Sequence, residues 1–143
     1  DETDIKWKLN NTVLDGMRND IEVYRWRGII SDAPVYQAYL KQVNDIKERY
    51  KECLMLGRYN DVFGFTCSND KLDARSFVSE DGNRMAVVVA YQSRKKYDSL
   101  SAEITASGYR LTDSMATGGG QVGVDGIVRL GQYDLAVLLF EKE

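Results

Sequence analysis

The sequence predicts a mainly β fold: an antiparallel sandwich of six to eight strands, Greek-key or jelly-roll-like, with one or two amphipathic helices packed on one sheet. Its 143 residues suffice for one domain with a substantial core. Apolar residues recur at helical spacing before Gly57, and short β-rich runs separated by turn residues follow it. We therefore divide the chain into a helical segment, 1–57, and a sandwich, 58–143, which together form one compact unit.

A first helix is predicted where apolar residues at three- and four-residue spacing form one stripe. Asn11 or Thr12 would be its N-cap, and residues 1–10 would form a further turn or a frayed lead-in. The stripe consists of Val13, Leu14, Met17, Ile21 and Tyr24.

A second helix is predicted from about Val35 to Leu56. Asp32 can cap it, and Pro34 lies in the first turn, where a missing N–H does no harm. Gly57 follows the last stripe residue, where a left-handed conformation is expected. The buried stripe is predicted to contain Tyr36, Tyr39, Leu40, Val43, Ile46, Tyr50, Cys53 and Leu54.

On the polar face of this helix, Asp45 and Arg49 are spaced for an i, i+4 ion pair. The long stripe predicts that the helix packs on the β-region. Leu40→Ala and Leu54→Ala should then destabilise the protein, whereas Lys41→Ala should not.

The remaining chain predicts seven strands. The sequence Glu80–Asn83 indicates a hairpin, because Asp-Gly tolerates the positive φ of a tight turn. The strands Arg84–Tyr91 and Tyr133–Glu141 are apolar at odd and even positions alike, so both of their faces must be covered. The helices are the available cover for the outer face. The other predicted strands are Val62–Cys67, Ala74–Val78, Ala102–Ala106, Tyr109–Thr112 and Gly126–Leu130.

Composition excludes several classes of function. Lys and Arg number 19 against 22 Asp and Glu, a net charge of −3, which argues against nucleic-acid binding. Histidine is absent, which excludes Ser-His-Asp and Cys-His catalysis and His-ligated zinc, and two cysteines cannot form a four-cysteine site. The sequence contains no membrane span, and its acidic start is unlike a signal peptide. We predict no metal and no cofactor.

The glycine-rich run Gly118–Gly123 is the most conspicuous motif. A phosphate-binding loop would need a helix directly after it, whereas a β-like stretch follows, so the run is interpreted as an inter-strand loop. Asn69, Asp70 and Asp73 could offer oxygens to calcium, but their spacing fits a turn better.

Carboxylates are numerous, yet none is singled out as an acid–base pair. Glu80, Asp81, Asp134 and Glu141 are interpreted as surface charges, and no catalytic residue is predicted.

The two cysteines, Cys53 and Cys67, are interpreted as buried free thiols, with a disulfide as the alternative. The basic run Arg94–Lys96 is interpreted as a solvated loop between strands.

Aromatic residues are the last candidates, because a flat ring with a polar rim can stack on a sugar. The default interpretation is core packing, with Tyr36, Tyr39 and Tyr50 on the buried stripe. The sugar-binding residues are unknown, since periodicity does not place Trp26, Tyr91, Tyr97 and Tyr109.

From Asp32 onward the chain resembles the C-terminal region of bacterial TIM-barrel glycoside hydrolases of the alpha-galactosidase-like kind, over about three quarters of its length. The resemblance implies last barrel helices followed by a β-sandwich. The family's catalytic carboxylates lie on barrel strands, so no catalytic residue is carried over. The matching stretches are Asp32–Tyr36, Tyr39–Lys41, Ile46–Tyr50, Leu54–Tyr59, Ala74–Val78, Asp81–Val89 and Leu135–Phe140.

The function implied is that of a non-catalytic C-terminal accessory domain of a glycoside hydrolase, with the parent's barrel as its partner and a periplasmic or secreted location. Two alternatives stay open: a carbohydrate-binding module using exposed aromatics, and a small interaction domain unrelated to sugars. Excess apolar residues among 1–30, including Ile5, Trp7, Trp26 and Ile29, predict an exposed apolar area and self-association there.

Overall fold

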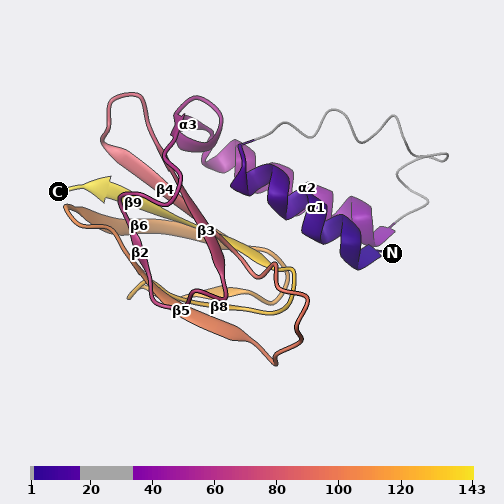
Figure 1. Ribbon diagram of the computed structural model, residues 1–143. Helices are drawn as coiled ribbons and strands as arrows, with labels where there is room; N and C mark the ends of the chain where they lie inside the picture. Colours follow the sequence, from indigo (N-terminus) through magenta and orange to yellow (C-terminus); the bar gives the residue numbers. More distant parts are fainter. Residues whose placement is uncertain (1, 17–33) are drawn as a thin grey trace.

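The structure is a computed structural model that describes residues 2–16 and 34–143 (Figure 1). It is mainly β, as predicted. The helices are α1 (Glu2–Leu14), α2 (Pro34–Arg49) and the short α3 (Lys51–Leu54). The strands are β1 (Arg58–Tyr59), β2 (Thr66–Cys67), β3 (Asp73–Val78), β4 (Arg84–Ala90), β5 (Leu100–Thr105), β6 (Tyr109–Ala116), β7 (Gln121–Val122), β8 (Ile127–Leu130) and β9 (Leu135–Lys142).

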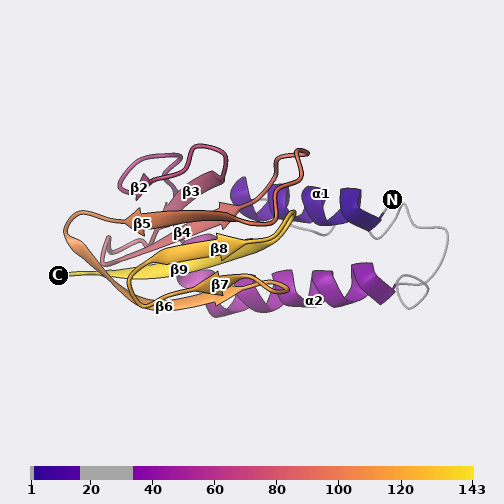
Figure 2. The ribbon, with the colours of Figure 1, turned by 90° about the horizontal axis from the view of Figure 1, so that it is seen from below.

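The strands form two antiparallel sheets. Sheet A has the order β1-β3-β4-β9-β6, and sheet B has the order β2-β5-β8-β7. Figure 2 shows sheet B nearest the viewer, with sheet A behind it and the helices behind sheet A. The molecule therefore has three layers, and sheet A is the middle one.

The central strands β4 and β9 supply both cores of the protein. Val88 and Val137 pack with the helices, whereas Val87 and Leu138 pack between the two sheets, and none of these four side chains is exposed. Successive strand residues point to opposite faces, so a strand buried on both faces must be apolar throughout. This arrangement confirms that the helices cover the outer face of one sheet.

The helices α1 and α2 lie side by side and run in the same direction (Figures 1 and 2). Both begin at the end of the molecule marked N, and α2 leads into α3 beside the β3–β4 hairpin (Figure 1). The residues that they bury against sheet A include Leu9, Val13, Leu14, Tyr39, Val43, Ile46, Tyr50 and Cys53.

The predicted start of the first helix is wrong. Asn11 and Thr12 lie inside α1, which occupies most of the segment interpreted as a lead-in and ends before Gly16. Gly16 has φ +68°, the conformation that ends a helix, and its N–H donates to the Val13 carbonyl. Apolar periodicity did not reveal this helix, because its buried face includes the polar residue Asn10. The hydrogen-bond partners of the Asn10 side chain lie far away in the chain. The stripe residues Met17, Ile21 and Tyr24 and the cap Asp32 lie outside the described residues.

A glycine is needed at position 57 because two backbone segments approach each other closely there, and not because the chain makes a left-handed turn. Its φ is not positive, but a Cβ at this position would lie 2.4 Å from the Val78 carbonyl oxygen and 2.6 Å from that of Cys53. The glycine therefore lets the end of α3 pack directly onto strand β3.

The predicted second helix is interrupted at Tyr50, which has φ −108° and ψ 26°. The ion pair predicted between Asp45 and Arg49 is also wrong. Asp45 pairs with Lys41 at 3.0 Å, while Arg49 reaches across to Asp113 on β6 at 2.9 Å. The Arg49 guanidinium lowers the pKa of Asp113, and the Tyr50 hydroxyl donates to the same carboxylate. Helix spacing alone could not reveal this partner on the sheet.

Several strands differ from their predicted bounds. Only the end of Val62–Cys67 is a strand, because the chain turns at Asp61 and crosses from sheet A to sheet B. The short strands β1 and β7 were not predicted, since two residues carry no alternation pattern. The Glu80–Asn83 hairpin between β3 and β4 is confirmed, with Gly82 at φ +75°.

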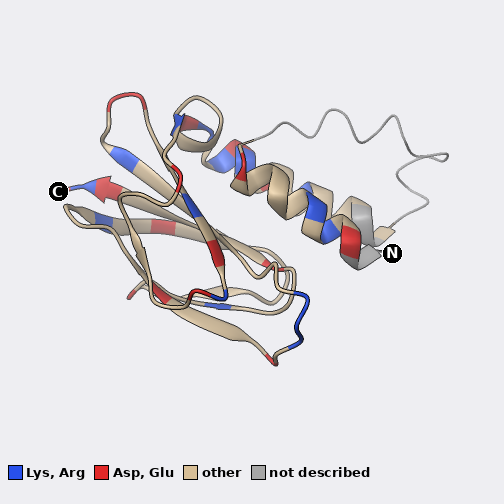
Figure 3. Ribbon diagram, viewed as in Figure 1, with Lys and Arg blue, Asp and Glu red and all other residues tan. Residues whose placement is uncertain are grey.

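Basic and acidic residues are mixed along the helices and strands (Figure 3). Within the described part of the chain, no helix combines the length and the apolar character that a membrane crossing needs.

Candidate functional site

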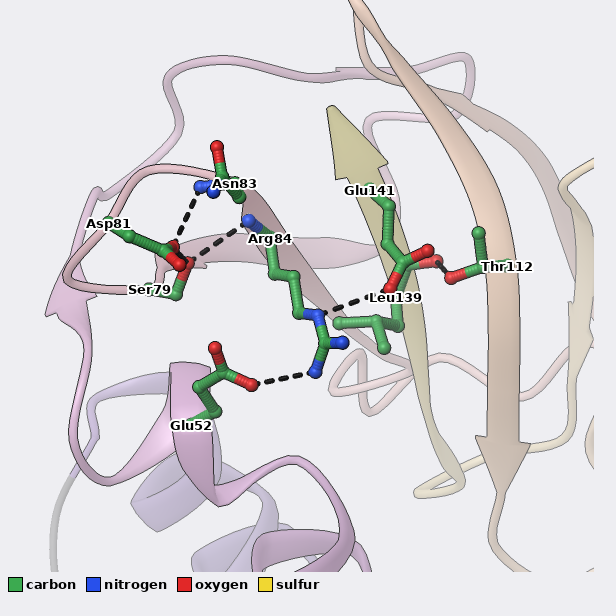
Figure 4. A network of polar contacts seen from close by, with 8 residues as sticks. All are labelled: Glu52, Ser79, Asp81, Asn83, Arg84, Thr112, Leu139 and Glu141. Atoms are coloured by element: carbon green, nitrogen blue, oxygen red, sulfur yellow. Dashed lines mark hydrogen bonds and ion pairs between the residues drawn. The ribbon is translucent and has the colours of Figure 1, made fainter. Parts of the chain in front are cut away.

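A polar hollow of about 430 Å³ lies where α3 meets the β3–β4 hairpin and the end of β9. At its centre, Arg84 connects two carboxylates from different elements (Figure 4). The Arg84 Nη1 lies 2.7 Å from Glu52 Oε2, and its Nε lies 3.1 Å from Glu141 Oε1. The other lining residues are Asp81, Asn83 and Lys142.

The hairpin that presents Arg84 is held by its own side chains. The Ser79 hydroxyl donates to Asp81 at 2.7 Å and accepts from the Arg84 N–H, while the Asn83 N–H donates to Asp81 at 2.9 Å. These hydrogen bonds lower the pKa of Asp81, and the bond from the Asn83 N–H has the largest effect. The turn therefore keeps Asp81 ionised and fixes where the Arg84 side chain begins.

This arrangement does not suit general acid–base work on a glycosidic bond. The two carboxylates of Glu52 and Glu141 share one guanidinium, which occupies the space where a scissile bond would have to lie. All three side chains are about one-third to one-half exposed, so the ion pairs contribute little to stability. The geometry instead fastens α3 to the end of sheet A where β4 begins and β9 ends.

A second polar cluster is buried between α1, α2 and sheet A. Asn10, which is 0 % exposed, accepts from the Tyr39 hydroxyl and donates to Gln92 Oε1 at 3.0 Å and to the Tyr133 carbonyl at 2.9 Å. The Tyr39 hydroxyl oxygen also lies 3.0 Å from the Tyr133 carbonyl oxygen, and burial raises the pKa of this hydroxyl. The tyrosine is therefore neutral, and Asn10 joins α1 to α2 and to the loops next to β4 and β9.

The cluster continues toward the loops that follow β4 and β6. Gln92 donates to the Trp7 carbonyl at 2.9 Å and to Asn11 at 3.0 Å. Thr117, also fully buried, lies 3.3 Å from Asp134 and accepts from the Leu135 N–H. Burial raises the pKa of Asp134. Each polar group in this cluster has a hydrogen-bond partner within the protein. The cluster therefore stabilises the fold and does not form a binding site.

Exposed apolar side chains concentrate in one segment. Five large apolar residues between α3 and β2 are about half or more exposed: Met55 (54 %), Leu56 (65 %), Tyr59 (49 %), Val62 (51 %) and Phe63 (66 %). The helical segment, where exposure was expected, differs. Among residues 4–16, Leu9, Val13 and Leu14 are buried and Ile5 and Trp7 are half-buried. Trp26 and Ile29 lie outside the described residues, so self-association through residues 1–30 stays a prediction.

The glycine run is an inter-strand loop, as interpreted. Gly118–Gly123 connects β6 to β8 and includes the short β7, with no helix after it. The Gly118 N–H donates to Gln42 on α2 at 2.9 Å, which adds another tie between helix and sheet. Asn69 also serves a turn, because its Oδ1 accepts from the Lys71 N–H at 3.0 Å.

Both cysteines are free thiols and belong to different cores. Cys53 is buried beneath the helices, whereas the half-buried Cys67 packs with residues between the sheets. The interpretation of two free thiols therefore agrees with the structure, but only Cys53 is fully buried. Burial raises the pKa of the Cys53 thiol to about 11, which leaves it protonated near neutral pH.

We expect a thiol reagent such as dithionitrobenzoate to modify Cys67 rapidly and Cys53 only when the protein unfolds. The physical reason is that Cys53 is 1 % exposed and its thiolate is disfavoured. Absorbance of the released thionitrobenzoate measures both phases. The fast phase should vanish in Cys67→Ser and persist in Cys53→Ser; fast modification of both thiols would contradict the burial of Cys53.

The remaining candidates are distributed as follows. Arg94–Lys96 is exposed, as interpreted, and Arg94 lies over the Trp7 ring at 5.9 Å. Tyr39 and Tyr50 are buried as predicted, and Tyr91 is fully buried. Tyr97 and Tyr109 are half-buried. The side chains of Tyr36 and Trp26 are not described.

Two exposed aromatic residues, Tyr59 and Phe63, were missed by sequence reasoning. Phe63 fell inside the predicted strand Val62–Cys67, and Tyr59 followed the helix. The pair Asn60-Asp61 between them is a turn signal that could have separated the two rings from the strand.

Comparisons with known proteins give no match, whether to a family model, to a curated protein or to a solved structure.

Proposed function

We propose that this chain is a non-catalytic accessory domain of a glycoside hydrolase, which holds a sandwich in a fixed position against the catalytic barrel. The observation that carries this proposal is the buried contact of Asn10, Tyr39 and Gln92 between the helices and sheet A. Such a contact fixes the orientation of the sandwich relative to the helices. A domain that braces a barrel requires this fixed orientation. That the parent is a glycoside hydrolase is proposed from the resemblance of the chain, from Asp32 onward, to the end of barrel enzymes.

The direction of the helices also supports the proposal. In a barrel of alternating strands and helices, successive helices run parallel because a strand returns the chain between them. Here α1 and α2 run in the same direction and pack against each other (Figures 1 and 2). Adjacent helices joined by a short connection would instead be antiparallel.

The strand connections fit the Greek-key or jelly-roll-like character that we also propose for the sandwich. Between β4 and β9 the chain passes from one sheet to the other four times, at β4–β5, β5–β6, β6–β7 and β8–β9. Sandwiches of this kind place sequential strands in opposite sheets in the same way.

The first test is catalysis by the purified chain. We expect no turnover of a panel of aryl α- and β-glycosides, because the Glu52 and Glu141 carboxylates in the hollow are both held by Arg84. Glu52→Gln and Glu141→Gln serve as matched variants. Release of the aryl group by the unaltered chain, lost in one of the single variants, would contradict the proposal.

The second test concerns the parent protein. We expect an antibody against this chain to detect, in the source cells, a longer polypeptide whose gene encodes a barrel before Asp1. Immunoprecipitated material should hydrolyse an aryl glycoside, and its peptides should include both barrel and sandwich. A single band at the mass of the 143-residue chain would overturn the accessory role.

A further inference from the structure

The segment after α3 contains two exposed aromatic residues, and one of them, Tyr59, has an Asp–Arg pair held beside it. Tyr59 is 49 % exposed and lies on β1, the edge strand of sheet A, and Phe63 is 66 % exposed and lies in the turn that follows, where its N–H donates to the Asn60 carbonyl. The Tyr59 ring and the buried Phe77 ring pack edge to face, with a centroid distance of 5.4 Å and an interplanar angle of 66°. This contact fixes the orientation of Tyr59 while leaving half of the side chain open to solvent.

A row of polar groups borders Tyr59. Its hydroxyl donates to Asp61 Oδ1 at 3.4 Å, and the same oxygen lies 3.7 Å from the Nε of Arg75 on the neighbouring strand β3. The row therefore offers a phenol, a carboxylate and a guanidinium in sequence. The Asp61 side chain is 53 % exposed and that of Arg75 is 30 % exposed, so both can still bind a ligand.

The backbone of this segment is held in place before any ligand arrives. The Ser76 N–H donates to the Asp61 carbonyl at 2.8 Å, and the Ser76 hydroxyl donates to the Phe63 carbonyl at 2.7 Å. Asp61 has φ 53°, a left-handed conformation that aspartate tolerates better than most residues. A pre-formed surface loses little conformational entropy on binding.

The combination suits a pyranose ring. One face of a sugar presents C–H groups that pack on an aromatic ring, and its rim presents hydroxyls that both donate and accept. Asp61 accepts hydrogen bonds, Arg75 donates them, and the Tyr59 hydroxyl does either. A phosphate group would be repelled by Asp61, and an apolar peptide would have to desolvate the Asp61–Arg75 pair without compensation.

We propose that Tyr59, Asp61, Phe63 and Arg75 form a surface site that binds a pyranose unit of a polysaccharide. The site lies outside the Arg84 hollow and does not depend on the accessory role proposed above. Binding is the only function assigned to it.

The test is affinity electrophoresis of the whole chain in native gels that contain galactomannan, xyloglucan, arabinogalactan or starch. We expect at least one polysaccharide to retard the protein. Phe63→Ala and Tyr59→Ala should each weaken binding roughly tenfold, as expected for aromatic residues at the centre of a binding surface. Asp61→Asn should also weaken it, since asparagine keeps the left-handed backbone but removes the charge.

Val124→Ala is the matched control, because Val124 is a fully exposed apolar side chain (100 %) on the β7–β8 turn. It should leave retardation unchanged, and melting temperatures will show that every variant is folded. The proposal is overturned if none of the four polysaccharides retards the chain, or if Phe63→Ala and Val124→Ala change the mobility equally. Neither result would alter the outcome of the aryl-glycoside and immunoprecipitation experiments.

Discussion

Replacing Ile46 by alanine is expected to lower the free energy of unfolding by about 2–5 kcal/mol. Ile46 is 0 % exposed and lies on α2 in the core that the helices share with sheet A. The substitution removes buried methyl and methylene groups and leaves a cavity that packed neighbours fill only in part. Urea unfolding followed by circular dichroism measures the change.

The matched control is Lys41→Ala on the same helix. The Lys41 side chain is 77 % exposed, and its ion pair with Asp45 is a surface pair whose loss costs below about 0.5 kcal/mol. Leu40→Ala and Leu54→Ala should fall between these two variants, because both leucines are half-buried rather than buried as the helical stripe predicted. Equal effects of Ile46→Ala and Lys41→Ala would show that α2 does not pack on the sheet.

Asn10→Ala is expected to destabilise the protein by about 2–4 kcal/mol, although alanine is the better helix former. The change leaves the buried Gln92 Oε1 without its donor and removes one acceptor from the Tyr39 hydroxyl. A buried polar group that loses its hydrogen-bond partner keeps most of its desolvation penalty, which lowers the free energy of unfolding. The unfolding free energy, together with hydrogen exchange of the α1 and α2 amides, measures this effect.

Gln37→Ala, at an exposed position of α2, is the control for Asn10→Ala and should change the unfolding free energy little. If Asn10→Ala were as neutral as Gln37→Ala, or if exchange accelerated only in α1, the polar cluster would not couple the two helices to the sandwich. The bracing role proposed for the domain would then lose its main support.

Much of the fold follows from patterns that are local in the sequence. The hairpin at Glu80–Asn83 was predictable because Asp-Gly favours one turn geometry, and β4 and β9 were predictable because burial on two faces requires apolar residues throughout. The same strands also predicted a covering layer of helices. These inferences need only the periodicity of a strand or helix and the chemistry of a turn.

The candidate sites were less predictable, since they depend on which residues meet across the fold. Arg84 binds Glu52 and Glu141, which are 32 and 57 positions away, and no spacing rule links them. Tyr59 and Phe63 are exposed because the chain leaves sheet A at this point, although aromatic residues are usually buried.

The sequence by itself determined the helical and β-rich segments, the two strands that are buried on both faces of the sheet and the three-layer arrangement, because each depends on local periodicity. Only the tertiary structure decided that Asn10 belongs to a buried face and that Arg49 turns to Asp113. It also decided that Gly57 serves close packing. In each case the conformation depends on a contact with a residue that is far away in the chain. The local sequence around a polar residue or a glycine looks the same whether or not such a contact exists.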